Sequence, residues 1–319
     1  MSTSETVRPL DEDALRVFEQ KGLEGGPEIQ QQGNANAVKV RRVMQLTRDL
    51  ARRNFDELRV LDLACGEGVY SIEAALRGAE VVAIDGRTER MDDGVRIAAR
   101  AGLTRLRFEQ HDIRGVTRAT HGAFDVVYLL GILYHLDSDS VFRVLENVRE
   151  MTRGVVIIDT HIALQGDTER EYGGRHYEGS QRREHEDTDS EAARQARVLM
   201  SLDNTFSFWL TKASLVRMLV DIGFTSVAEV HAPLEPGKSD NRVTLVVAGG
   251  ETVAISTYPW INGLVEDEIA RTLQRAEAEK AANRAERPVE QPGSSPARII
   301  NGVLRATLGL ELRRLPRQR

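Results

Sequence analysis

Short apolar runs alternate with helix-like stretches along the middle of the chain. Five runs rich in Val, Leu and Ile are typical of strands: Arg59–Leu63, Glu80–Ile84, Arg105–Glu109, Asp125–Leu130 and Val155–Asp159. The stretches between them with the apolar spacing of amphipathic helices are Tyr70–Arg77, Arg87–Ala101 and Ser140–Met151. This alternation predicts a parallel sheet with right-handed crossovers and helices on both faces.

The flanking segments extend this pattern. A loop is expected at Gly22–Gly33, which contains four glycines and a proline, and an amphipathic helix at Ala37–Arg53. Towards the other end, a helix at Lys212–Ile222 precedes strands at Ser226–His231 and Arg242–Ala248. A closing hairpin of this kind is common at the end of a parallel sheet. We therefore expect an α/β fold with a doubly wound, mostly parallel seven-stranded sheet.

The chain is expected to have three parts. A helical cap covers residues 1–57, the α/β domain 58–250, and a helical extension 251–319 with a linker at 288–296. The polar segment His161–Asn204 is too long for an ordinary connection, so we interpret about 161–205 as a lid over the catalytic end of the sheet. The basic, amphipathic tail Ala297–Arg319 suits a membrane surface, an acidic partner or RNA, or docking on its own domain or in a homo-oligomer.

Composition narrows the class of protein. A hydrophobic fraction of 41% with 29% charged residues is typical of a globular protein and excludes wholesale disorder. No apolar run approaches the roughly 20 residues that span a bilayer. The first residues lack a secretion signal, and the single cysteine, Cys65, excludes an internal disulfide, so we expect a cytoplasmic protein. A net charge of -6 supplies no basic field for a nucleic acid.

The first chemical signal is the loop that follows the first predicted strand, which reads Asp62-Leu63-Ala64-Cys65-Gly66-Glu67-Gly68 and leads into a helix near Tyr70. Small residues here let the backbone approach a ligand closely, and the acid Asp62 suits a positively charged one. The loop has no lysine for a phosphate, which excludes a P-loop, and no third glycine in dinucleotide register.

Three further signals follow at the ends of the next strands. Asp85-Gly86 lies about 20 residues beyond the glycine loop, where an acid accepts hydrogen bonds from ribose hydroxyls. After the third strand, Asp112 in the segment His111-Asp112-Ile113 can accept from an adenine amino group while Ile113 packs on the ring. The fourth strand ends at Leu130 and runs into Gly131, where the reacting group of a ligand would be presented.

In this order, the four motifs resemble the class I S-adenosylmethionine-dependent methyltransferase superfamily over about Leu58–Ala248. The resemblance implies S-adenosylmethionine as cofactor. The residues expected to bind it are Asp62, Ala64, Cys65, Gly66, Gly68, Tyr70, Asp85, Gly86, His111, Asp112, Ile113, Leu130 and Gly131. Ala64 departs from the first glycine usual in the family, a mild change.

Three segments resemble methyltransferases related to the bacterial tRNA wobble-uridine modifying enzymes: Gly131–His135, Ile157–His161 and Ser207–Thr211. In that group the tyrosine of the Leu-Tyr-His segment lies beside the reactive end of the cofactor, which suggests such a place for Tyr134. Many relatives act on small molecules, so the substrate does not transfer with the resemblance.

Candidates for catalysis follow the predicted strands on the same edge. His135 and His161 could serve as general bases or as scaffold histidines, with Asp159 at the end of the fifth strand and Tyr134 as further site residues. The expected substrate-binding residues are Tyr172, His176, Tyr177, Asn204 and Trp209. The insertion also carries enough His and carboxylate groups to hold a divalent cation, but without tight ligand spacing we expect no metal.

We therefore expect an enzyme that transfers a methyl group to an O, N or C nucleophile of a small molecule, in biosynthesis. Methylation of a tRNA wobble uridine is the first alternative. The second is a non-catalytic adenosylmethionine-binding regulatory or assembly protein, and a nicotinamide dehydrogenase is a remoter one.

Overall fold

The computed structural model describes residues 27–235 and 237–251, together with the single positions 274 and 278. The chain divides into two compact units, Met1–Thr252 and Val253–Arg319, and almost all of the second lies outside the described residues. The predicted linker and basic tail also lie outside them. The boundaries proposed from the sequence for the three parts therefore stay predictions.

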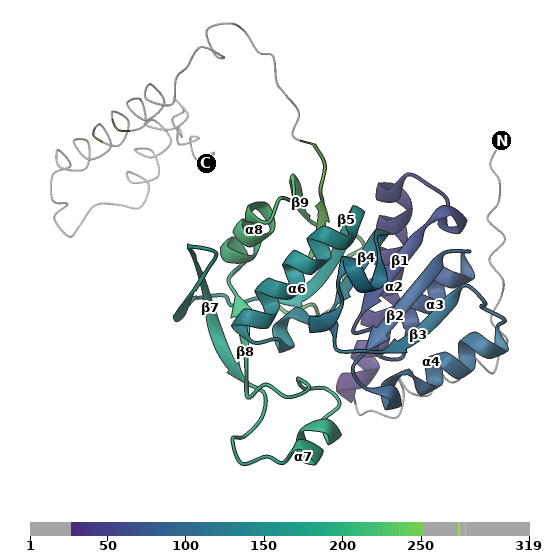
Figure 1. The fold of residues 1–319 in the computed structure, drawn as a ribbon, viewed down its shortest axis with the longest axis horizontal. Coiled ribbons are helices and arrows are strands. Elements are labelled where there is room, and N and C mark those ends of the chain that lie inside the picture. The colour runs from purple at the N-terminus through teal and green to yellow at the C-terminus, as the bar shows by residue number, and fades with distance from the viewer. Residues whose placement is uncertain (1–26, 236, 252–273, 275–277, 279–319) are drawn as a thin grey trace, which may run out of the picture. The chain divides into compact units, whose positions relative to one another are not determined.

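A seven-stranded sheet in the order β3-β2-β1-β4-β5-β10-β9 forms the centre of the first unit (Figure 1). Its strands are β1 (Arg59–Leu63), β2 (Glu80–Asp85), β3 (Leu106–Gln110), β4 (Phe124–Leu130), β5 (Thr152–His161), β9 (Ser226–Glu229) and β10 (Arg242–Ala248). The first five strands run parallel, whereas β10 is antiparallel to both β5 and β9. This arrangement confirms the predicted mostly parallel, doubly wound sheet.

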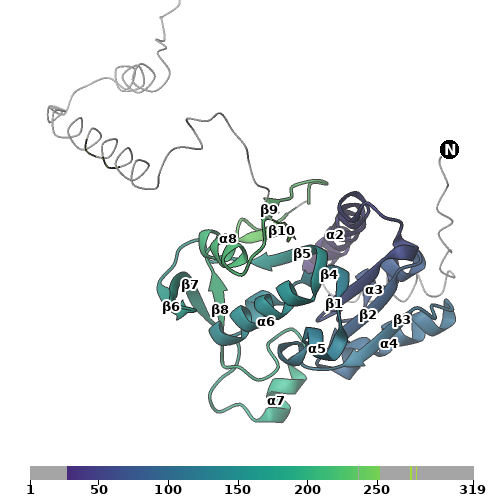
Figure 2. The ribbon, with the colours of Figure 1, turned by 45° about the horizontal axis from the view of Figure 1, so that its top comes forward.

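Helices cover both faces of the sheet (Figure 2). One apolar cluster joins the sheet to α2 (Pro27–Ala51), α3 (Val69–Leu76) and α4 (Thr88–Arg100). The other cluster joins it to α6 (Ser138–Met151) and α8 (Lys212–Asp221). Successive residues of the central strands β1, β2, β4 and β5 alternate between the two clusters, which explains why these strands are mostly apolar on both faces. Short elements complete this part: η1 (Phe55–Glu57), η2 (Ile113–Gly115), α5 (Arg118–His121) and η3 (Leu133–His135).

Helix α2 is longer than the sequence pattern predicts. The expected loop at Gly22–Gly33 is wrong from Pro27 onward, because α2 begins at that residue. Proline is well suited to a helix start, since its missing N–H would have no intrahelical partner there and its φ is already helical. No helix in the described parts of the chain is long and apolar enough to cross a bilayer.

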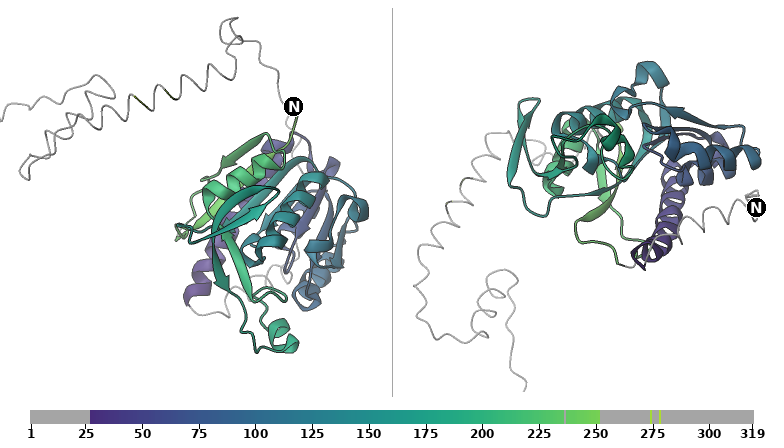
Figure 3. Two further views of the ribbon diagram at one scale, coloured as in Figure 1. Left: turned by 60° about the vertical axis from the view of Figure 1, so that its left-hand side comes forward. Right: turned by 90° about the horizontal axis from the view of Figure 1, so that it is seen from below.

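The polar insertion contains regular structure that its composition does not indicate. The strands β6 (Thr168–Tyr172), β7 (Arg175–Arg183) and β8 (Phe206–Leu210) form a separate antiparallel sheet, and α7 (Glu191–Ala196) lies between β7 and β8 in the chain (Figure 3). Only some positions of β7 are buried, among them Tyr177 and Ser180, so its exposed charges hide the strand pattern. His161 itself ends β5.

Candidate active site

A cavity of about 580 Å³ lies where the parallel strands β1, β2, β4 and β5 end. Its size is that of a small-molecule site, and its position at the carboxyl edge of the sheet is where α/β folds bind ligands. Most residues predicted to bind the cofactor line it: Ala64, Cys65, Gly66, Tyr70, Asp85, Gly86, Asp112, Ile113, Leu130 and Gly131. The four candidate catalytic residues line it too: Tyr134, His135, Asp159 and His161.

The loop after β1 has the backbone shape that its small residues allow. Ala64, Gly66 and Gly68 all have positive φ, of 61°, 56° and 75°. A Cβ on Gly66 would come within 2.9 Å of the Arg90 guanidinium, and one on Gly68 within 2.5 Å of the Phe108 ring. Gly66 therefore keeps the cavity wall thin, whereas Gly68 lets α3 begin against β3 and does not line the cavity.

Asp85 is buried at the end of β2, between the loop that follows β1 and the start of α4. Its Oδ2 accepts a hydrogen bond from the Gly66 N–H at 2.9 Å, and its Oδ1 accepts one from the Arg87 N–H at 2.9 Å. Each carboxylate oxygen keeps a further lone pair. The arrangement leaves Asp85 able to accept two hydroxyl groups while it ties the glycine loop to the start of α4.

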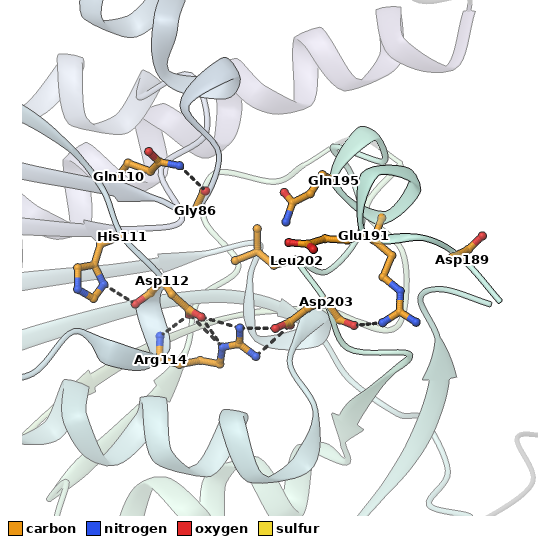
Figure 4. A pocket seen from close by; sticks show the side chains of 11 residues that line it. Gly86, Gln110, His111, Asp112, Arg114, Asp189, Glu191, Gln195, Leu202 and Asp203 are labelled. Carbon is orange, nitrogen blue, oxygen red and sulfur yellow. Dashed lines mark hydrogen bonds and ion pairs between the residues drawn. The ribbon is translucent and has the colours of Figure 1, made fainter. Parts of the chain in front are cut away.

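The Asp112 carboxylate accepts hydrogen bonds from Arg114. Although burial alone raises its pKa, hydrogen bonds from Arg114 hold the pKa of Asp112 below the ordinary value. Arg114 also donates to both oxygens of Asp203, at 3.0 and 2.8 Å, and so joins the strand end to the insertion (Figure 4). His111 lies with them in a second, more open cavity of about 500 Å³ beside α7, and does not line the large one.

Asp62 lies beneath the loop and does not line the cavity. Its Oδ2 accepts a hydrogen bond of 2.6 Å from the Ser71 hydroxyl. Burial raises the pKa of Asp62 to about 7, the bond from Ser71 opposes the rise, and the Asp85 carboxylate adds to it. A cation bound above the loop would favour the charged form of this acid.

This pKa has a consequence for stability that can be measured on the cofactor-free chain. The carboxyl ionises near pH 3.8 when unfolded and near pH 7 when folded, so its contribution to stability is complete below pH 3.8 and is lost progressively as the pH rises from 3.8 through 7. The Asp62→Asn variant, which never ionises, is expected to gain stability relative to the wild type between about pH 5 and about pH 8, because below pH 7 the two pH dependences differ in slope by up to about 1.4 kcal/mol per pH unit.

Urea unfolding at the two pH values measures this difference. Asp92→Asn, on an exposed position of α4, is the matched control and is expected to follow the wild type. Parallel pH dependences of Asp62→Asn and the wild type would show that the folded carboxyl has an ordinary pKa.

The far end of the cavity is built around Arg242, the first residue of β10. Its Nε donates to Asp159 Oδ1 at 2.6 Å, and its guanidinium lies 5.8 Å from the Tyr134 ring centroid. Asp159 Oδ2 accepts from the Thr244 hydroxyl at 2.7 Å. Although burial alone raises it, the pKa of Asp159 stays below the ordinary value because of Arg242. Asp159 therefore holds Arg242 in place.

His161 has both ring nitrogens occupied. Nδ1 lies 2.9 Å from the Asn241 amide oxygen, and Nε2 lies 3.2 Å from an Arg242 nitrogen that can only donate. The ring is therefore neutral with its proton on Nδ1, and burial lowers the pKa of His161. This geometry favours the scaffold role over the general-base role. Trp209 stacks on the ring, with centroids 5.2 Å apart.

The predicted substrate-binding residues separate into two groups. Asn204 lines the cavity. Trp209 does not line it but donates its indole N–H, at 2.8 Å, to the carbonyl of Tyr134, which does. Tyr172, His176 and Tyr177 do not reach the cavity. The two tyrosine hydroxyls donate to Glu146 of α6 and Asp221 of α8, and the His176 side chain is 60% exposed on the small sheet. The structure thus corrects these three positions to packing and surface roles.

Sequence reasoning missed several residues that line the cavity. Lys39 comes from α2, Arg87 from the β2–α4 connection, Arg90 from the first turn of α4 and Arg242 from β10. The insertion adds Val198, Leu199, Met200, Leu202 and Asp203. An arginine directly before the apolar run 243–248 was the one available signal for Arg242. Among the described residues, no group of three or more His, Cys, Asp or Glu side chains could hold a metal ion.

Comparisons with known proteins agree with this geometry. Residues 60–154 match the family model described as a methyltransferase domain. A ubiquinone biosynthesis O-methyltransferase of Psychrobacter cryohalolentis is 32% identical over 93 residues, which are 27% of this chain and 36% of that relative. The chain thus spans little more than a third of the curated relative that it matches.

Two solved structures share the fold. The N-terminal domain of EvdMO1, crystallised in the presence of SAH and D-fucose, has a TM-score of 0.52 and 22% identity over 66% of this chain and 82% of its own. The magnesium protoporphyrin IX methyltransferase of Synechocystis PCC 6803 with bound SAM has a TM-score of 0.50 and 16% identity, over 76% and 93%. Residues 60–154 therefore match a methyltransferase domain, and the first unit shares the Rossmann-like fold of these two methyltransferase structures.

Proposed function

We propose that the chain is an S-adenosylmethionine-dependent methyltransferase and that its cofactor binds in the 580 Å³ cavity. The observation that carries the proposal is the continuity of this cavity. It runs from Asp85 at one end, past the glycine loop, to Tyr134 and His135 at the other. A carboxylate suited to ribose hydroxyls and a candidate proton acceptor thus line one cavity, as a methyl donor and its substrate require.

The residues present fit this cofactor. Asp85 has lone pairs for two ribose hydroxyls, Ile113 and Leu130 supply apolar walls for a base, and Gly66 leaves room that a side chain would fill. The buried carboxyl of Asp62 lies under the loop, where it favours a cation above it. When bound, S-adenosylmethionine supplies a methyl group already activated by its sulfonium. The protein then has to position the acceptor and, for a hydroxyl or amine, remove its proton.

The acceptor proposed is a small molecule with an O, N or C nucleophile. Two features support this proposal. The reactive end of the cavity is bounded by Tyr134, His135 and Asn204, and the chain as a whole carries a charge of -6. The ubiquinone-pathway relative is an O-methyltransferase by name, which favours oxygen among the three. The likeness to the tRNA wobble-uridine branch stays a prediction.

The test incubates the full chain with methyl-labelled S-adenosylmethionine and cell metabolite extracts, and follows S-adenosylhomocysteine and labelled products by mass spectrometry. Formation of S-adenosylhomocysteine together with a labelled small molecule is the expected result. Label in purified tRNA instead would favour wobble-uridine methylation. Binding of S-adenosylmethionine without any S-adenosylhomocysteine would favour the non-catalytic binding protein.

A further inference from the structure

The two histidines on the cavity differ in what their ring nitrogens contact. Both nitrogens of His161 are occupied, as described above. His135 Nδ1 faces both carboxylate oxygens of Glu184, at 3.2 and 3.1 Å. Within residues 27–235 and 237–251, no hydrogen bond engages His135 Nε2. His135 is therefore the cavity histidine with a ring nitrogen left for a ligand.

Glu184 is held firmly behind His135. It lies just after β7, its side chain is 7% exposed, and it accepts a hydrogen bond of 2.9 Å from the Ser201 N–H. Its backbone N–H donates to the Thr205 carbonyl at 2.8 Å. Although burial alone raises it, the pKa of Glu184 is held below the ordinary value by His135 and the Ser201 N–H. The carboxylate therefore acts as an acceptor only.

A second contact fixes the backbone on which the ring is carried. The Asn204 side-chain amide donates to the His135 carbonyl at 3.1 Å, and the His135 N–H donates to the Ile132 carbonyl at 2.9 Å within η3. The Tyr134 ring packs against the imidazole, with centroids 4.3 Å apart. Main chain, ring face and Nδ1 are thus all held, so the direction of Nε2 is fixed as well.

We propose that Glu184 is a positioning residue, which keeps the His135 proton on Nδ1 so that Nε2 is the base that deprotonates the methyl acceptor. This inference rests on the proposed methyltransferase function. It assigns a role in catalysis to the insertion, because Glu184, Ser201 and Asn204 all belong to it. The insertion would then align the base as well as cover the cavity.

The step balances without a further reactant. His135 Nε2 takes the proton of an acceptor hydroxyl or amine while the acceptor atom forms a bond to the methyl carbon. The carbon–sulfur bond breaks, and its electron pair stays on sulfur, which gives the neutral thioether S-adenosylhomocysteine. The imidazolium formed on His135 lies against the Glu184 carboxylate, whose charge stabilises it until the proton passes to solvent.

The tautomer can be read without any substrate. Imidazole nitrogen NMR of the full chain at alkaline pH, with His135 assigned by its loss in His135→Gln, is expected to show a proton on Nδ1 and a bare Nε2. In Glu184→Gln the amide can donate as well as accept, so a mixture of tautomers is expected. Glu184→Asp keeps a carboxylate and is expected to restore the Nδ1 proton. Glu186→Gln, an exposed change in the same insertion, is the matched control.

The rate of turnover is the second readout. It is measured with the metabolite fraction that supports formation of S-adenosylhomocysteine in the test of the proposed function. Glu184→Gln is expected to lower kcat on the order of 10²-fold, with the dissociation constant of S-adenosylmethionine unchanged and partial recovery in Glu184→Asp. A wild-type His135 protonated on Nε2, or a Glu184→Gln variant with the wild-type tautomer and full kcat, overturns the inference.

The two readouts separate the inference from the function on which it rests. If no extract supports turnover, the proposed function fails while the NMR result still reports whether Glu184 sets the tautomer. Thermal denaturation shows whether Glu184→Gln folds. If it does not, the position of the His135 proton in the wild-type and Glu184→Asp spectra tests the inference.

Discussion

The Arg242→Met variant is expected to lose about 3–5 kcal/mol of unfolding free energy, the range for removing one member of a buried ion pair. Arg242 is bonded to Asp159, which is 4% exposed at the centre of the sheet edge. Without the guanidinium, the buried carboxylate keeps its bond from Thr244 and the charge of Lys39, which also lowers its pKa, but it loses the cation that is hydrogen-bonded to it. Urea unfolding at neutral pH measures the loss.

The double variant Asp159→Asn/Arg242→Met is the control for this prediction. It removes both charges, so its loss is expected to be clearly smaller than that of Arg242→Met alone. The gap between the single variant and the wild type should also narrow in acid, because the unpaired Asp159 becomes protonated and neutral there. Equal losses in the single and double variants would contradict the role given to the ion pair.

The Asp85→Ala variant is expected to weaken S-adenosylmethionine binding by about 1–3 kcal/mol, the cost of unmaking hydrogen bonds to a buried charged group. That corresponds to a dissociation constant roughly 5–150 times higher. The carboxylate would lose its bonds to the ligand, and the Gly66 and Arg87 N–H groups would lose their acceptor. Calorimetric titration measures the change.

Asp92→Ala, on the exposed face of α4 a few residues further on, is the control and should bind like the wild type. Thermal denaturation of Asp85→Ala separates a local effect from a loss of fold. Unchanged affinity in a folded Asp85→Ala variant would remove this residue from the binding site.

Features set by local pattern were predictable from the sequence. β1 and β10 have the expected bounds, because both begin at an arginine, are buried on two faces, and reach an alanine at or directly after their last residue. The position of Asp85 was predictable as well. An acid at the end of a parallel strand necessarily lies at the carboxyl edge of the sheet. The order of strands and helices along the chain therefore predicts the edge of the sheet at which the cavity lies.

Features set by contacts between distant parts of the chain were not predictable. Arg242 meets Asp159 across 83 positions, and Glu184 meets His135 across 49. The sequence alone does not distinguish His135 from His161 as the candidate base. Only the fold shows that Arg242 occupies Nε2 of His161, whereas Glu184 takes Nδ1 of His135. The strands β6 and β7 could not be predicted because charged residues interrupt the apolar pattern of both, and most positions of β7 are exposed.

The most direct test of the account is calorimetric titration of the full chain with S-adenosylmethionine, S-adenosylhomocysteine and NADH in parallel. The glycine loop and the acid after β2 would serve either nucleoside cofactor, so this comparison decides between methyl transfer and hydride transfer. We predict saturable binding of S-adenosylmethionine and S-adenosylhomocysteine at one site per chain, and none of NADH. Binding of NADH without binding of S-adenosylmethionine would contradict the account.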